Sequence, residues 1–207
     1  MSADDQQAYV ARWDARYSSG DTPWDTGLVS RELVKFLDRG VIAEGHAVDL
    51  GCGTGTNARE LRRRGFQVSA VDCSAVALEQ ARMATNPAED IQYFDADVRN
   101  WIPPFPPCDF LFDRGCYHCV RRTNLAGFLN TLQRIARPGT QILLLAGNDR
   151  EITENGPPTV SEAQIRDDFA DVCDVMSIEE FHFEDAGGVQ GPLGWSCHFV
   201  WRSSASE

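Results

Sequence analysis

The chain has 207 residues, of which 43% are hydrophobic and 24% charged, a size and balance that fit one compact domain. Its formal net charge of −12 argues against a nucleic acid as partner, because binding to a phosphate backbone depends on clustered Lys and Arg. Its apolar runs are too short to cross a bilayer, and the acidic N-terminus is no secretory signal. We therefore expect a soluble, cytoplasmic protein that is a monomer by default.

The first 40 residues predict two helices joined by a loop. Tyr9, Trp13 and Tyr17 recur at helical spacing, and the polar run 18–23 then interrupts the pattern. A second helix is expected from about Val29 to Leu37, before the stop at Gly40.

From residue 41 onward, predicted strands and helices alternate, which indicates an α/β fold with a mostly parallel sheet wrapped by helices. The expected strands are 46–50, 67–71, 91–94, 109–112, 141–146, 175–183 and 195–201. The expected helices are 58–64, 74–84, 124–136 and 161–169. We therefore expect residues 1–207 to form a single domain, with the helical segment 1–40 preceding a core of 41–207.

The first strand ends in the run Asp49-Leu50-Gly51-Cys52-Gly53-Thr54-Gly55. Glycines permit a tight turn and close approach to a ligand, and the following helix presents free amide groups. A dinucleotide fingerprint would have its third glycine at Thr56, and no Lys-Ser or Lys-Thr pair follows as in a Walker loop. The acid at Asp49 suits a zwitterionic ligand end better than a phosphate. A tight turn without a ligand is the alternative.

This motif resembles that of the class I S-adenosylmethionine-dependent methyltransferases, which reads acid-x-Gly-x-Gly-x-Gly. The resemblance implies a doubly wound, Rossmann-like, seven-stranded sheet with helices on both faces and an antiparallel last strand. It also implies S-adenosyl-L-methionine as cofactor and S-adenosyl-L-homocysteine as product. The implied contacts are Asp49, Gly51, Cys52, Gly53, Thr54, Gly55 and Asn57. A nicotinamide-dependent oxidoreductase and a non-catalytic binding module are the competing classes; Thr56 and Asp49 disfavour the first.

The next two strands also end in acids. Asp72 stands where a carboxylate can accept both ribose hydroxyls, or it is simply an acid at the start of a helix. By resemblance, Cys73 borders the adenine, Asp97 accepts from its amino group, and Ala96 and Val98 offer backbone groups. An ordinary loop acid remains the alternative for Asp97.

The fourth strand runs into Asp113-Arg114-Gly115-Cys116-Tyr117-His118-Cys119, which gathers the most reactive groups of the chain. His118 is a candidate base near neutral pH or a packed loop histidine, and Asp113 could position the acceptor or complement the sulfonium. Arg114 and Tyr117 are further candidates for binding the acceptor, Tyr117 also for catalysis.

The seven cysteines should be mostly reduced thiols. Cys116 and Cys119 form a single Cys-x-x-Cys pair without the second pair that a zinc ribbon needs, so we expect no metal site. They are interpreted as small apolar filler, with handling of a soft metalloid as the alternative.

The N-terminal pattern Trp13-Asp14-x-Arg16-Tyr17, then Pro23-Trp24-Asp25-Thr26-Gly27, is similar to the opening of the thiopurine methyltransferase-like branch, with its thiol, halide and tellurite methyltransferases. The resemblance implies an N-terminal helical lid, with Trp24 as a cofactor contact and Trp13 as a lid residue near the substrate. Aromatic packing is the alternative for Trp13. The ending of strand four differs from that of the plant halide and thiol enzymes.

The sequence thus predicts methyl transfer to a small molecule by in-line displacement, with a thiol or another soft nucleophile as acceptor. Such a reaction requires alignment and exclusion of water more than a strong base. Asp149, in the loop after strand five, is expected to help enclose the substrate. The alternative acceptor is the oxygen or nitrogen of a small phenol or heterocycle.

Overall fold

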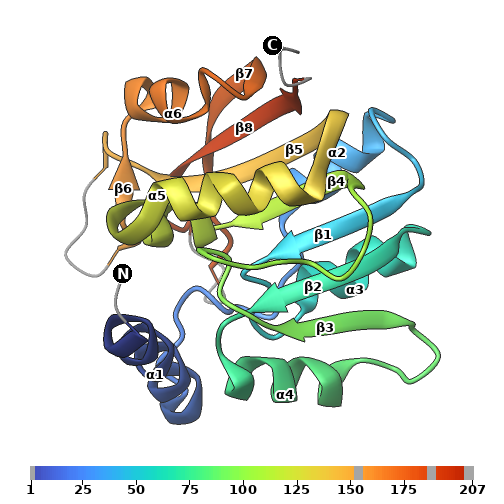
Figure 1. Cartoon of the computed structure of the whole chain (residues 1–207), viewed down its shortest axis with the longest axis vertical. Helices are drawn as coiled ribbons and strands as arrows, with labels where there is room; N and C mark the ends of the chain where they lie inside the picture. Colours follow the sequence, from blue (N-terminus) through green and yellow to red (C-terminus); the bar gives the residue numbers. More distant parts are fainter. Residues whose placement is uncertain (1–2, 152–155, 186–189, 203–207) are drawn as a thin grey trace.

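The computed structural model of the chain describes residues 3–151, 156–185 and 190–202. A mixed sheet forms its middle layer, in the strand order β3-β2-β1-β4-β5-β8-β7, and the short β6 pairs with β5 (Figure 1). Strands β1 to β5 pair in parallel, whereas β8 lies antiparallel between β5 and β7. The strands are β1 (His46–Leu50), β2 (Gln67–Asp72), β3 (Ile91–Asp95), β4 (Cys108–Arg114), β5 (Ala136–Asn148), β6 (Thr159–Val160), β7 (Cys173–His182) and β8 (Leu193–Trp201). The predicted Rossmann-like sheet is confirmed.

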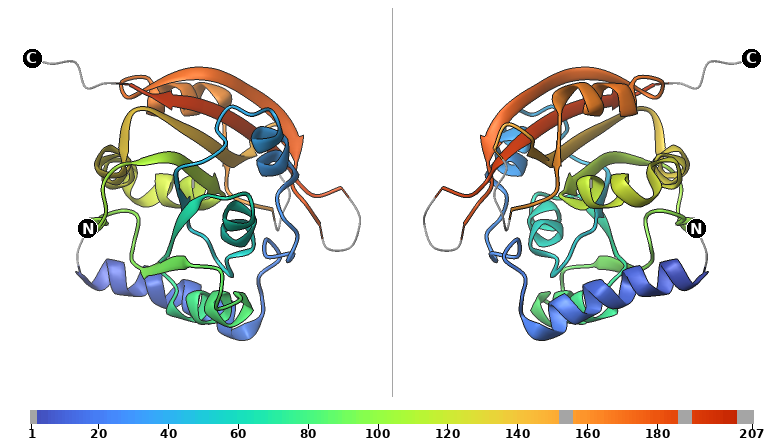
Figure 2. Two further views of the ribbon diagram at one scale, coloured as in Figure 1. Left: turned by 90° about the vertical axis from the view of Figure 1, so that its right-hand side faces the viewer. Right: turned by 90° about the vertical axis from the view of Figure 1, so that its left-hand side faces the viewer.

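Helices cover both faces of the sheet (Figures 1 and 2). They are α1 (Ala3–Ser19), α2 (Arg31–Asp38), α3 (Thr56–Arg63), α4 (Ala75–Ala84), α5 (Cys116–Ile135) and α6 (Glu162–Phe169). Because side chains alternate along a strand, Val48 and Leu50 pack into the core under α5 and α6, whereas Ala47 packs into the core under α2, α3 and α4. None of the described helices is long and apolar enough to cross a membrane.

Helix α1 lies beside α4, next to the ends of β2 and β3 (Figure 1). Ser74 caps α4, since its hydroxyl accepts from the amide of Ala77, and the same hydroxyl donates to Asp14 of α1 at 2.7 Å. This bond fixes the N-terminal helix against the edge where the strands end.

Two predicted boundaries differ from the structure by more than two residues. Helix α5 begins at Cys116, directly after Gly115 in a left-handed conformation (φ 92°), and is kinked at Asn124, where we expected its start. Strand β5 begins at Ala136 rather than residue 141, because Thr140 accepts from the amide of Arg137 and donates to the carbonyl of Cys108. The helix therefore ends as predicted, but the chain continues at once as a strand.

Candidate active site

The glycine turn between β1 and α3 is closely packed. Gly51 and Gly53 both have positive φ angles, 65° and 54°. A Cβ on Gly53 would lie 2.7 Å from the hydroxyl oxygen of Tyr17, and one on Gly51 would lie 2.7 Å from Cβ of Cys116. Backbone conformation and neighbouring side chains thus both require glycine here.

Asp72, at the end of β2, supports this turn from the neighbouring strand. Its carboxylate accepts hydrogen bonds from the amides of Gly53 at 2.9 Å and Ser74 at 2.8 Å. Burial raises the pKa of Asp72 to about 6, although these hydrogen bonds favour the ionised form. The carboxylate predicted to bind ribose thus also holds the glycine turn in place.

Asp49, at the end of β1, has a buried oxygen without a partner. The residue is 2% exposed, and its Oδ2 has no hydrogen bond to any described residue. Burial raises the pKa of Asp49 to about 7, and the negative charge of Asp72 adds to the rise. Buried polar atoms are normally paired, so this oxygen marks a position for a ligand group that donates a hydrogen bond.

Residues 20–30, which we call the strap, cross over the glycine turn. Thr54 donates to Asp25 at 3.0 Å, and Asn57 accepts from the amide of Ser30 at 3.0 Å. The indole of Trp24 donates to the hydroxyl of Tyr17 at 3.2 Å. A cavity lies between the strap and the turn, and its lining includes Trp24, Asp49, Gly51, Gly53, Asn57 and Arg114. Residues predicted separately from motifs therefore share one cavity.

Trp13 joins this region through aromatic contacts. Its ring packs edge to face on Trp24, with centroids 5.5 Å apart, and on Tyr9 at 6.1 Å. The structure therefore shows the aromatic packing that was the alternative for Trp13, on the helix that leads into the strap.

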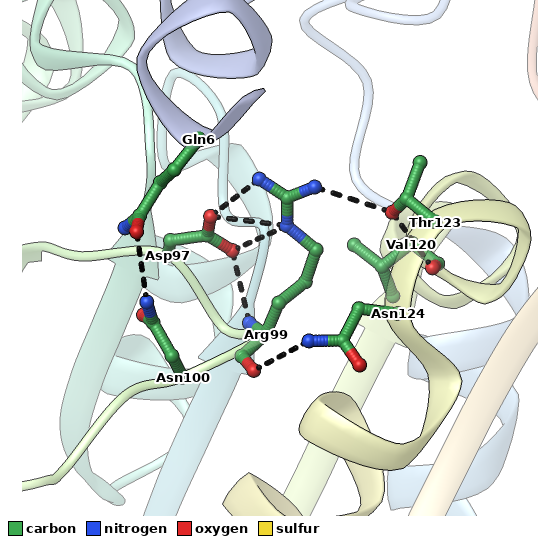
Figure 3. A network of polar contacts seen from close by, with 7 residues as sticks. All are labelled: Gln6, Asp97, Arg99, Asn100, Val120, Thr123 and Asn124. Carbon is green, nitrogen blue, oxygen red and sulfur yellow. Dashed lines mark hydrogen bonds and ion pairs between the residues drawn. The ribbon is translucent and has the colours of Figure 1, made fainter. Parts of the chain in front are cut away.

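Asp97, after β3, is engaged by a residue that the sequence analysis missed. Figure 3 shows the guanidinium of Arg99 against both carboxylate oxygens of Asp97, with an Nη2–Oδ2 distance of 2.6 Å. The ring of Tyr9 lies under this guanidinium at 3.6 Å, and Thr123 accepts from its Nη1. The Asp97 carboxylate therefore shapes the loop after β3, next to Ala96 and Val98. The amide of Ala96 in turn donates to the carbonyl of Asp72 at 3.0 Å.

Asp113, at the end of β4, is hydrogen-bonded to the first turn of α5. Its carboxylate accepts from the amides of Cys116 and Tyr117, each at 2.9 Å. Burial raises the pKa of Asp113 to about 8. Its side chain thus holds the helix start, in addition to any role toward a ligand.

His118 is held neutral. Its Nδ1 accepts from the amide of Gly147 at 2.9 Å, so the ring proton lies on Nε2. Burial and, to a lesser extent, the charges of Arg122 and Arg114 together lower the pKa of His118 to about 3. This environment does not suit the predicted general base and agrees with the alternative of a packed histidine.

Tyr117 requires a correction. Its side chain is fully buried against Phe128 and Phe169, and its hydroxyl donates to Asp168 at 2.6 Å. The structure therefore places Tyr117 in the core rather than among the ligand-facing groups, because its side chain points into the core from the first turn of α5.

The thiols of Cys116 and Cys119 lie near one another on the first turn of α5. Burial raises the pKa of both thiols, that of Cys119 to about 12, and Cys116 packs on Gly51. Within the described residues, no group of three His, Cys, Asp or Glu side chains could hold a metal ion. Packing is the role that these contacts support. Cys73 is half-buried after β2.

Arg114 lies in the cavity with Asp49, and its partner was not predicted. Glu184, after β7, accepts from Nη2 of Arg114 at 3.0 Å, and the carbonyl of Trp24 accepts from Nη1 at 3.0 Å. Glu184 is 70 residues away in sequence, so no local pattern could reveal this pair. Asp149 is exposed directly after β5, beside the undescribed residues 152–155.

Comparisons with known proteins agree with this geometry. The family model of thiopurine S-methyltransferase (TPMT) matches residues 8–190. A probable thiol methyltransferase 2 of Arabidopsis thaliana is 24% identical over 149 residues, covering 70% of this chain and 65% of that protein. The chain thus matches slightly less than two thirds of that relative's length.

Solved structures share the fold. One, from work on the conversion of a disulfide bond into a thioacetal group during echinomycin biosynthesis, has a TM-score of 0.74 and 24% identity, covering 88% of this chain and 87% of that one. TehB from Haemophilus influenzae has a TM-score of 0.66 and 15% identity, covering 83% of this chain and 62% of that one.

Proposed function

Because the chain belongs to the thiopurine S-methyltransferase family, we propose that it is an S-adenosylmethionine-dependent methyltransferase whose acceptor is a thiol or another soft nucleophile on a small molecule. The name of the Arabidopsis relative, a probable thiol methyltransferase, supports a sulfur acceptor. The disulfide chemistry studied with the structural neighbour supports it too.

The cavity fits the amino acid end of the methyl donor. Asp49 offers an unpaired carboxylate oxygen for the α-amino group. Arg114 offers a guanidinium in the same cavity, which suits the carboxylate, so we assign Arg114 to the donor rather than to the acceptor. The glycine turn lets the backbone approach this amino acid end, which we call the tail, without a Cβ collision.

The remaining contacts follow from the strand ends. Asp72 would hold the ribose, and the segments at Cys73 and at Ala96 and Val98 would border the adenine. Asp97 forms an ion pair with Arg99, so it would hold this loop in place rather than accept a hydrogen bond from the adenine amino group. Asp113 would lie beside the sulfonium at the end of β4, and the positive charge of the sulfur would favour its ionised form against the effect of burial.

The bound donor supplies an activated methyl group on a cationic sulfur. The protein's part is to align this group and keep water away from it. Trp24, a strap residue hydrogen-bonded to Tyr17, would cover the part of the site that binds the amino acid end of the methyl donor.

One observation carries the choice of acceptor: the two groups predicted to act on it as bases, His118 and Asp113, already have hydrogen-bond partners. Nδ1 of His118 accepts from Gly147, and the Asp113 carboxylate accepts from the amides of α5. An alcohol or phenol needs help to lose its proton, whereas a thiol is substantially ionised near pH 8.5. The site therefore suits an acceptor that brings its own nucleophilicity.

A matched pair of acceptors tests this choice. We expect the protein to form S-adenosylhomocysteine with thiophenol and at least about a hundredfold more slowly with phenol, because only the thiol ionises readily near neutral pH. Mass spectrometry of the methylated products measures both rates. Equal rates would contradict the thiol assignment, and donor binding without product from thiols, phenols, heterocycles or metalloid oxyanions would indicate a non-catalytic module.

Donor binding should depend on pH through Asp49. In the free protein this carboxyl has a pKa of about 7, so it is mostly protonated at pH 6, and binding the α-amino group must release that proton. We expect the affinity for S-adenosylmethionine to be about tenfold weaker at pH 6 than at pH 8, and Asp49→Asn to reduce this dependence. Calorimetric titration at both pH values measures it. A pH dependence unchanged in Asp49→Asn would rule out Asp49 as its source.

A further inference from the structure

Glu184 is a buried carboxylate that joins three segments far apart in the sequence. It is 4% exposed and follows β7. Its Oε1 accepts from the amide of Arg31, the first residue of α2, at 2.7 Å. Its Oε2 accepts from Nη2 of Arg114, at the end of β4, at 3.0 Å. A buried charge is tolerated only with such partners, so Glu184 and Arg114 depend on each other.

The guanidinium of Arg114 has donors left over. The guanidinium has five N–H groups. Glu184 accepts from the N–H of Nε and from one N–H of Nη2, and the carbonyl of Trp24 accepts from one N–H of Nη1. Within the part of the chain that the structure describes, one N–H on Nη1 and one on Nη2 have no partner. Two free donors on the two terminal nitrogens are what a carboxylate needs for a bidentate contact.

The position of Arg114 matters because Asp49 lines the same cavity, close enough for the two charges to influence each other. If Arg114 lost Glu184, Asp49 would be an available carboxylate for it. An Arg114–Asp49 pair would occupy both groups that the zwitterionic tail requires. Glu184 thus competes with Asp49 for the guanidinium and leaves Asp49 free.

We propose that Glu184 is a positioning residue for the binding of S-adenosylmethionine. It fixes Arg114 and the strap so that the two unpaired N–H groups of the guanidinium face the carboxylate of S-adenosylmethionine. The ring of Phe183 also packs on this guanidinium, with its centroid 5.3 Å from Cζ of Arg114, and so restricts the movement of the arginine. The bond to Arg31 anchors the far end of the strap to the same carboxylate. This inference rests on the proposed function, because it assigns a role within donor binding.

The test compares two ligands that differ in the amino acid tail. S-adenosylmethionine has the carboxylate, whereas 5′-methylthioadenosine has the adenosine part but no tail. We expect Glu184→Gln, which retains an acceptor for Arg31 but loses the charge, to bind S-adenosylmethionine about tenfold more weakly and 5′-methylthioadenosine as the wild type does. In turnover, the KM for the donor should rise about tenfold with kcat nearly unchanged.

Glu60→Gln is the matched control. Glu60 is also a buried carboxylate with two arginine partners, Arg63 and Arg64, but it lies on α3 outside the cavity lining. We expect it to bind both ligands normally. If Glu184→Gln fails to fold, Arg114→Lys takes its place in the test. It should likewise bind S-adenosylmethionine more weakly and 5′-methylthioadenosine as the wild type does. Where both fold, adding Glu184→Gln to Arg114→Lys should weaken donor binding less than twofold further.

The outcomes separate the two claims. Wild-type affinity for both ligands in Glu184→Gln, or equal weakening of both, would overturn the positioning role. Full additivity with Arg114→Lys would overturn it as well. If the wild-type protein itself does not bind S-adenosylmethionine, the proposed function fails instead.

Discussion

Replacing Asp72 with alanine should weaken the binding of S-adenosylmethionine about a hundredfold, one of the two largest effects that we expect. The substitution removes the proposed ribose acceptor and also leaves the amides of Gly53 and Ser74 without their buried partner. Each unmet buried polar group costs about 1–3 kcal/mol, so the two losses together exceed the effect of a single ribose contact. Calorimetric titration with the donor measures the change.

Asp95→Ala provides the control for this substitution. Asp95 ends β3 directly opposite Asp72 in the strand register, but its side chain is exposed. We expect its affinity for the donor to be that of the wild type. Asp72→Asn retains an acceptor for one of the two amides and should fall between the wild type and Asp72→Ala. Unchanged affinity in a folded Asp72→Ala protein would show that the ribose assignment is wrong.

Gly53→Ala should abolish measurable donor binding. The new Cβ would lie 2.7 Å from the Tyr17 hydroxyl, and a φ of 54° costs an L-residue about 1–2 kcal/mol. Either the turn or Tyr17 must move, and movement of Tyr17 breaks its hydrogen bond to Trp24. We expect an affinity loss of at least about a hundredfold, measured by the same titration, because the tail binds directly against this turn.

Two further variants separate the collision from the backbone strain. Gly40 also has a positive φ, 69°, but a Cβ there meets nothing within 4 Å, so Gly40→Ala should lose some stability and bind the donor normally. Tyr17→Phe removes the colliding atom, so the double variant Gly53→Ala with Tyr17→Phe should recover part of the affinity. If Gly40→Ala loses as much affinity as Gly53→Ala, the packing of the turn is not the cause.

Sequence patterns predicted the sheet well because its signals are local. The glycine turn, the starts of α4 and α6 and the apolar strands β1 and β5 each depend on residues within a few positions of one another. The start of α5 was missed because a glycine followed by a Cys-Tyr-His-Cys run resembles a loop. The backbone of Gly115 and the capping carboxylate of Asp113, which decide that start, are visible only in three dimensions.

The candidate site was predicted in part for the same reason. Asp49 and Asp72 lie at the ends of adjacent strands, so parallel pairing alone brings them near each other. The pairing of Glu184 with Arg114 spans 70 residues and has no sequence signature. Arg99 is only two residues from Asp97, but the burial that makes their pairing important is not visible in the sequence. The roles of His118 and Tyr117 could not be read from residue type, because burial and hydrogen bonding decide whether such groups can exchange a proton. A monomeric state and a cytoplasmic location stay predictions.

A crystal structure with bound S-adenosylhomocysteine tests the central claim most directly. The account predicts the α-amino group within hydrogen-bond distance of Oδ2 of Asp49, the tail carboxylate on Arg114 and the ribose hydroxyls on Asp72. A tail directed away from the cavity under the strap, with Asp49 still unpaired, would contradict it.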